Sequence, residues 1–85
     1  MAERSVVVAV PEGLHARPAA LFVKLAGEQP TPVTIRRPDG APVSATSILS
    51  VMTLGVRAGD EVVLEADGAD GEAAVAALAE LLTRP

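Results

Sequence analysis

The sequence predicts an α+β protein: a β-α-β-β-α-β-α open-faced sandwich with a four-stranded, mainly antiparallel sheet and three helices on one face. The order of short β-branched and helical segments is the first observation behind this prediction. The second is that the strands are too few and too polar on one side for a parallel sheet covered on both faces. The third is the length of 85 residues, which fits one domain over residues 1–85 with a modest core.

The first strand and helix are predicted over residues 5–10 and 16–26. The strand is rich in valine. In the helix, apolar residues recur at i, i+3, i+4 and i+7 and predict one buried stripe, made of Pro18, Leu21, Phe22 and Leu25. The helix joins two strands by a right-handed crossover, so these strands should run parallel without being neighbours.

A hairpin is predicted next, with strands over residues 32–37 and 41–44. Val33 and Ile35 alternate with polar residues, and the tetrapeptide Arg-Pro-Asp-Gly at 37–40 is typical of a tight turn. Pro42 lacks a backbone N–H, which favours an edge position for the second strand of the hairpin.

The second half contains a helix of about two turns, a strand over residues 61–66 and a final helix over residues 71–82. Thr46 and Ser47 are good N-cap residues for the short helix, and Asp70 for the last one. Apolar side chains should line one face of the strand and bury one side of the last helix; they are Val62, Leu64 and Ala66 in the strand and Val75, Leu78, Leu81 and Leu82 in the helix.

Composition excludes several functions. The net charge of −4 and a single aromatic residue, Phe22, argue against nucleic-acid binding. The chain has no cysteine, no apolar run of about 18 residues and no signal-peptide pattern at its start, which favours a cytoplasmic protein. One histidine without clustered carboxylates or a phosphate-binding glycine-rich loop predicts no metal, no cofactor and no hydrolytic enzyme.

His15 and Arg17 are the candidate functional residues. His15 lies where a loop becomes a helix, and the unpaired N–H groups and positive dipole of that helix end favour a bound phosphate. Arg17 adds a cation with bidentate geometry, and Gly13 allows a tight turn. Such a sparse site is suited to carrying a phosphoryl group, with the transition-state electrostatics supplied by partner proteins. The alternative is that His15 only caps the helix or lies in a solvated loop.

The run Gly-Leu-His-Ala-Arg-Pro-Ala at 13–19 resembles the active-site motif of the HPr family, the histidine-containing phosphocarriers of the bacterial phosphoenolpyruvate:sugar phosphotransferase system. Residues 43–55 resemble the second motif of the family, and the resemblance covers essentially the whole chain. It implies a carrier, not an enzyme, which accepts a phosphoryl group on Nδ1 of His15 from phospho-enzyme I. The carrier would then hand that group to a IIA domain, with Arg17 assisting both transfers.

The resemblance also implies a partner-binding face on the first and second helices of a monomer, formed by Ala16, Ala20, Lys24, Ile48, Leu49 and Met52. We expect Val51 and Leu54 in the core and Leu49 facing outward. Core packing is the alternative for Ile48, Leu49 and Met52.

This sequence departs from the family in its cations and in the surroundings of Ser47. Thr46 stands where many members have lysine, and Gly27 and Ser50 stand where basic residues are common. Ser47 aligns with a serine that a dedicated kinase phosphorylates in many Gram-positive members, although it could simply cap its helix. The alternative functions are a nitrogen-type regulatory phosphorelay carrier and a regulatory protein acting through Ser47. The excess of arginine over lysine hints at a GC-rich bacterium.

Overall fold

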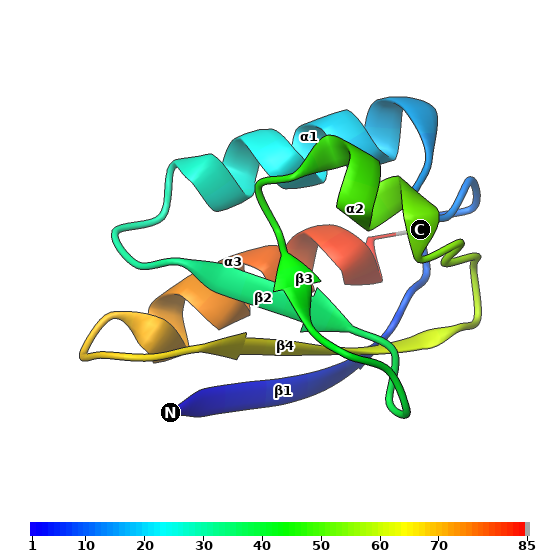
Figure 1. The fold of residues 1–85 in the computed structure, drawn as a ribbon. Helices are drawn as coiled ribbons and strands as arrows, with labels where there is room; N and C mark the ends of the chain where they lie inside the picture. Colours follow the sequence, from blue (N-terminus) through cyan, green and yellow to red (C-terminus); the bar gives the residue numbers. More distant parts are fainter. Residues whose placement is uncertain (85) are drawn as a thin grey trace.

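The computed structural model describes residues 1–84, and its elements follow the predicted order (Figure 1). They are β1 (Ala2–Val7), α1 (Ala16–Gly27), β2 (Val33–Arg36), β3 (Val43–Ser44), α2 (Ile48–Thr53), β4 (Glu61–Ala66) and α3 (Gly71–Thr83).

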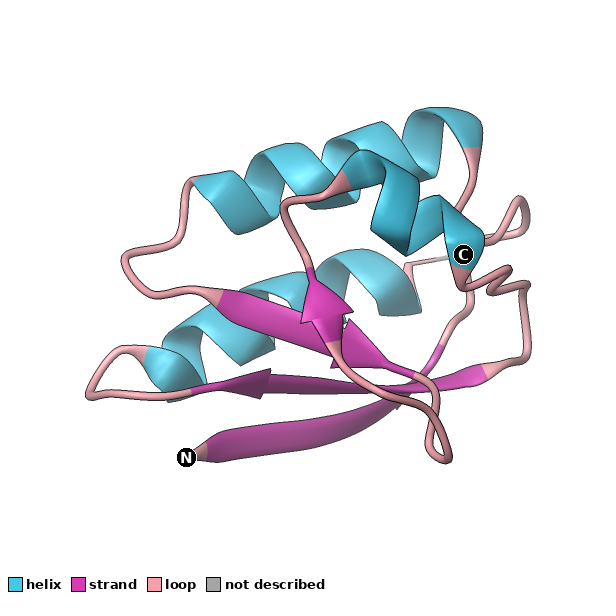
Figure 2. Cartoon of the chain, viewed as in Figure 1, coloured by secondary structure: helices cyan, strands magenta, loops and turns pink. Residues whose placement is uncertain are grey.

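The four strands form one sheet in the order β1-β4-β2-β3, and every neighbouring pair is antiparallel. β1 and β2 therefore run parallel with β4 between them, as the crossover predicted. The helices lie together on one face of the sheet (Figure 2). β3 is an edge strand, and Gly40 N–H donates to the Arg37 carbonyl oxygen at 3.0 Å in the predicted turn.

The first strand begins and ends three residues earlier than predicted, at Ala2–Val7 in place of 5–10. Its last pair joins Val7 to Glu61, the first residue of β4. Beyond this pair, the N–H groups of Val8 and Ala9 donate to the carbonyl oxygens of Asp60 and Leu82. A prediction based on valine content alone therefore placed the strand wrongly, because the limits of β1 depend on where its partner β4 begins.

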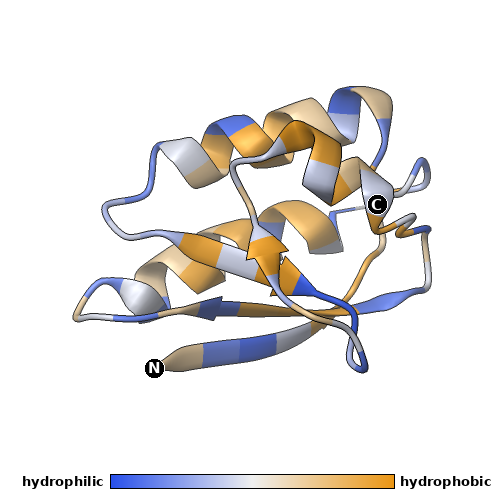
Figure 3. Cartoon of the chain, viewed as in Figure 1, coloured by the Kyte–Doolittle hydropathy of each residue, from blue (hydrophilic) through white to orange (hydrophobic). Residues whose placement is uncertain are grey.

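The core lies between the sheet and the helices, and its largest fully buried side chain is Phe22. In Figure 3, α3 is apolar along much of its length, whereas the middle of the edge strand β1 is hydrophilic. Exposed Glu3 and Arg4 account for the latter and discourage pairing of this edge with other chains.

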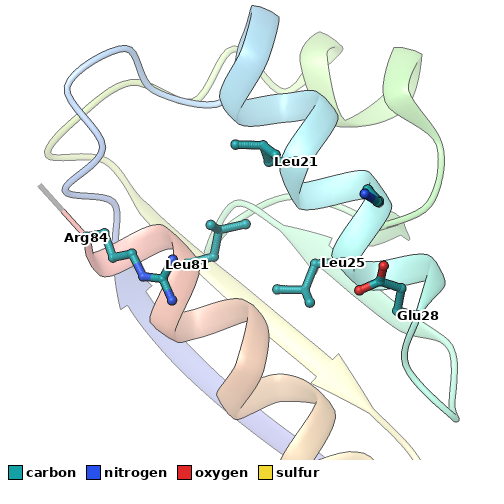
Figure 4. Close-up of a pocket in the computed structure, with 6 residues that line it drawn as sticks. Leu21, Leu25, Glu28, Leu81 and Arg84 are labelled. Atoms are coloured by element: carbon teal, nitrogen blue, oxygen red, sulfur yellow. The ribbon is translucent and has the colours of Figure 1, made fainter.

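The buried stripe of α1 was predicted correctly for Phe22 and wrongly for Leu21. Its buried residues are Ala19, Phe22 and Ala26, while Leu21 is 49% exposed and Pro18 and Leu25 are only partly buried. Leu21 instead lines a groove between α1 and α3, together with Leu81, which was also expected in the core (Figure 4). Ala19, Phe22 and Ala26 are spaced i, i+3 and i+7 and form the buried side of α1, so the adjacent Leu21 faces away from it.

Candidate functional site

His15 occupies the N-cap position of α1 with extended backbone angles, φ −145° and ψ 158°. Its side chain is exposed and makes no capping hydrogen bond. The His15 side chain therefore does not cap the helix, which was one alternative to a functional role, and its imidazole is accessible from solvent. The first turn of α1 carries no acidic residue, so no carboxylate of that turn competes for the free N–H groups.

Ala16, the next residue, has a φ of +54°. This left-handed conformation costs a non-glycine residue about 1–2 kcal/mol. The surrounding structure must hold it in place, and strain of this kind is often found at functional sites.

The loop before His15 is anchored to the segment after α2. Leu14 is buried, and its N–H donates to the Val56 carbonyl oxygen at 2.9 Å. Gly13 has a φ of +68°, and a Cβ at this position would lie 2.5 Å from that same oxygen. Only glycine allows the two backbones to approach this closely.

A second network holds the segment after α2 from the other side. Arg37 Nε donates to the Leu54 carbonyl oxygen at 2.9 Å, and Arg37 Nη2 donates to the Gly55 carbonyl oxygen at 2.8 Å. Arg37 Nη2 also lies 3.4 Å from Asp60 Oδ2, which accepts the Arg57 N–H at 3.0 Å. This N–H, together with the charges of Arg37 and Arg57, lowers the pKa of Asp60 below its usual value of 3.8.

Two adjoining hollows open beside this site. The first has a volume of about 230 Å³ and is lined by Glu12, Leu14, His15, Met52, Gly55, Val56 and Arg57. The second, of about 290 Å³, shares Glu12 and Leu14 with the first and is lined by Arg17, Pro18, Leu21 and Leu81 among others. His15 and Arg17 thus line separate hollows that share a wall. Arg57 was not singled out from the sequence, because it is 42 residues away from His15 along the chain.

The residues predicted for the partner face are all exposed. Ala16, Ala20 and Lys24 lie on α1, and Ile48, Leu49 and Met52 on α2. Leu49 is 76% exposed while Val51 is fully buried, as expected; Leu54 is partly buried. Core packing is therefore excluded as the role of Leu49.

Ser47 is the N-cap of α2, and it is partly buried. Its Oγ accepts the Ser50 N–H at 3.4 Å and donates to Ser50 Oγ at 3.0 Å. The capping role predicted for this serine is confirmed.

Fold and site together define a small α+β protein that presents one exposed histidine at a helix N-terminus, where a phosphoryl group could be held. The family described as "PTS HPr component phosphorylation site" matches residues 2–84. The phosphocarrier protein HPr of Streptomyces coelicolor is 51% identical over 82 residues, which cover 96% of this chain and 88% of that protein. A crystal structure of HPr from Bacillus anthracis matches with a TM-score of 0.90 at 37% identity, covering 95% of both chains.

The chain belongs to the HPr family of phosphocarrier proteins. It is a phosphocarrier of the phosphotransferase system. The protein carries phosphoryl groups between the partners of that relay and is not an enzyme. A crystal structure of an HPr dimer from Thermoanaerobacter tengcongensis is also similar, with a TM-score of 0.71 at 42% identity, covering 95% of this chain and 92% of that one. Within residues 1–84, no helix is both long and apolar enough to cross a membrane.

Proposed function

We propose that His15 is the phosphoryl acceptor, that phospho-enzyme I is its donor, and that a IIA domain is its acceptor partner. The observation that carries this proposal is the exposed imidazole at the N-terminus of α1, which makes no capping hydrogen bond. Nδ1 of a neutral imidazole attacks phosphorus; the bond between nitrogen and phosphorus forms as the bond to the donor breaks. The transfer to the IIA domain reverses these roles.

Three features favour the loaded form of His15. The N–H groups of the first turn of α1 face no carboxylate of that turn, and the helix dipole is positive at this end. Arg17, two residues on, is exposed and can reach phosphate oxygens. His15 is exposed, which leaves the phosphoryl group accessible to a second active site.

The partner face is the surface of α1 and α2 formed by Ala16, Ala20, Lys24, Ile48, Leu49 and Met52. Three exposed apolar side chains on a helix of six residues are unusual unless they are buried in a complex. With Lys24 as the one cation among these residues, we expect transfer rates that depend weakly on salt between about 50 and 300 mM. A steep salt dependence would contradict this.

We also propose that residues 1–85 act in the cytoplasm as a single, monomeric domain.

Ser47 remains a candidate for regulatory phosphorylation, which would add about −1.5 to −2 charges beside the partner face. Its hydroxyl must first leave Ser50. The test is labelling by an HPr kinase. If the kinase labels a known substrate but not the wild-type protein, this role of Ser47 is ruled out.

The test of the main proposal is labelling by enzyme I with phosphoenolpyruvate. Wild type should acquire an acid-labile, alkali-stable phosphate, and His15→Ala should acquire none. Leu49→Ser should still take the label, but with a raised KM for enzyme I. Its Tm should be unchanged, because the Leu49 side chain is 76% exposed. A label that persists in His15→Ala would overturn the assignment of the acceptor.

A further inference from the structure

We propose that Arg57 binds the phosphoryl group once it has been transferred to His15, and so stabilises the loaded carrier. This inference rests on His15 being the acceptor. Among the lysine and arginine residues of 1–84, Arg57 alone lines the hollow that contains His15. Arg17 lines the neighbouring hollow, and Lys24 lines the groove between α1 and α3.

The backbone of Arg57 is held close to the loop that carries His15. Its N–H donates to Asp60 Oδ2 at 3.0 Å, and its carbonyl oxygen accepts the Asp60 N–H at 3.0 Å. A Cβ on Gly13 would lie 2.8 Å from the Arg57 Cα, so the two segments are in contact. The contact at Gly13 and the hydrogen bond from Leu14 N–H to the Val56 carbonyl oxygen hold this segment beside the His15 loop, and the two hydrogen bonds to Asp60 fix the turn that begins at Arg57.

The guanidinium of Arg57 is available for a ligand. Arg36, Arg37 and Arg84 are each paired with a carboxylate, whereas Arg57 forms no side-chain ion pair within the described part of the chain. Arg57 is also exposed, so its side chain can turn toward an anion without leaving an ion pair.

The positive charge of Arg57 matters most when His15 carries the phosphoryl group. Glu12 lines the same hollow, and its negative charge opposes a phosphoryl dianion on His15. The cation on the opposite segment offsets that repulsion and can donate two parallel hydrogen bonds to phosphate oxygens. Arg57 therefore adds a positive charge beside His15, whereas Lys24 is the one cation of the partner face.

The test is the equilibrium of phosphoryl groups between enzyme I and the carrier, measured for wild type, Arg57→Gln and Arg57→Lys. Arg4→Gln is the matched control, because it removes the same charge from an exposed site on β1. Arg57→Gln should shift the equilibrium about two- to five-fold toward enzyme I, the range of an exposed ion pair. Arg57→Lys should recover most of this shift, and Arg4→Gln should leave the equilibrium unchanged.

An equilibrium between free proteins separates phosphoryl binding from docking. A docking residue changes the KM for enzyme I but leaves the equilibrium as it is, and that result would overturn the inference. The Arg57 Nε–Hε resonance should also shift when the wild type is loaded, and a resonance that stays in place would count against phosphoryl contact. If wild type takes no label at all, the proposed function fails and this inference with it; a labelled wild type with an unchanged Arg57→Gln equilibrium overturns the inference alone.

Discussion

Replacing Gly13 with alanine should strongly destabilise the protein and open the loop before His15. The new Cβ would lie 2.5 Å from the Val56 carbonyl oxygen and 2.8 Å from the Arg57 Cα. Both are backbone atoms, so neither can swing aside as a flexible side chain would. The loop must move, and the hydrogen bond between Leu14 N–H and the Val56 carbonyl oxygen must lengthen or break.

The magnitude has two parts. A φ of +68° costs alanine about 1–2 kcal/mol, and forced overpacking costs about 1–3 kcal/mol more. The free energy of unfolding should therefore fall by about 2–5 kcal/mol, out of about 4–13 kcal/mol for a domain of this length. Even the lower figure corresponds to a fall in Tm of about 8–16 °C.

Gly68→Ala is the matched control. Gly68 also has a positive φ, +87°, but a Cβ there would meet nothing within 4 Å. Urea unfolding of both variants should place Gly13→Ala about 1–3 kcal/mol below Gly68→Ala. Hydrogen exchange at the Leu14 amide should accelerate only in Gly13→Ala. Equal destabilisation of the two variants would refute the contact between the His15 loop and residues 56–57.

Three further perturbations test the packing and the charge network. Asp60 has a lowered folded-state pKa, so its stabilisation is present above its usual pKa of 3.8 and lost as the pH falls through the lowered value; the stability gap between wild type and Asp60→Asn should be largest at neutral pH and shrink on acidification in urea titrations. Phe22→Ala should cost about 3–5 kcal/mol, whereas Leu21→Ala should cost about 1 kcal/mol, because Leu21 is half exposed; equal costs in urea unfolding would mean that the buried face of α1 is assigned wrongly. Ser47→Ala should cost about 0.5–1 kcal/mol, since its capping bond to the Ser50 N–H is long at 3.4 Å, and a Tm equal to that of wild type would deny the cap a role.

Features set by neighbouring residues in the chain were predicted correctly. The turn at Arg37–Gly40, the capping serine of α2 and the helix start at His15 each depend on a few adjacent residues. The edge position of β3 was predicted from Pro42, a local signal, although the strand itself begins only at Val43. Antiparallel pairing and the crossovers through α1 and α2 then left few arrangements of the sheet.

Features set by distant partners were missed. β1 ends where β4 begins, some 54 residues away, and no pattern within β1 marks that point. Arg37 belongs to a hairpin turn by sequence, yet its guanidinium binds the end of α2 and Asp60, across 17 to 23 residues. Helical spacing identified α1 as amphipathic but favoured its leucines over the alanines that are buried.

The sequence by itself determined the order of the elements, the class of fold and the placement of His15 and Arg17 at the start of a helix, because backbone preferences and motif spacing act over a few residues. Only the tertiary structure decided which side of α1 is buried and which cation lies beside His15. Those outcomes depend on how closely several elements pack at once. Because Gly13 has no side chain, the segment after α2 can lie against the loop, and Arg57 of that segment then lines the same hollow as His15.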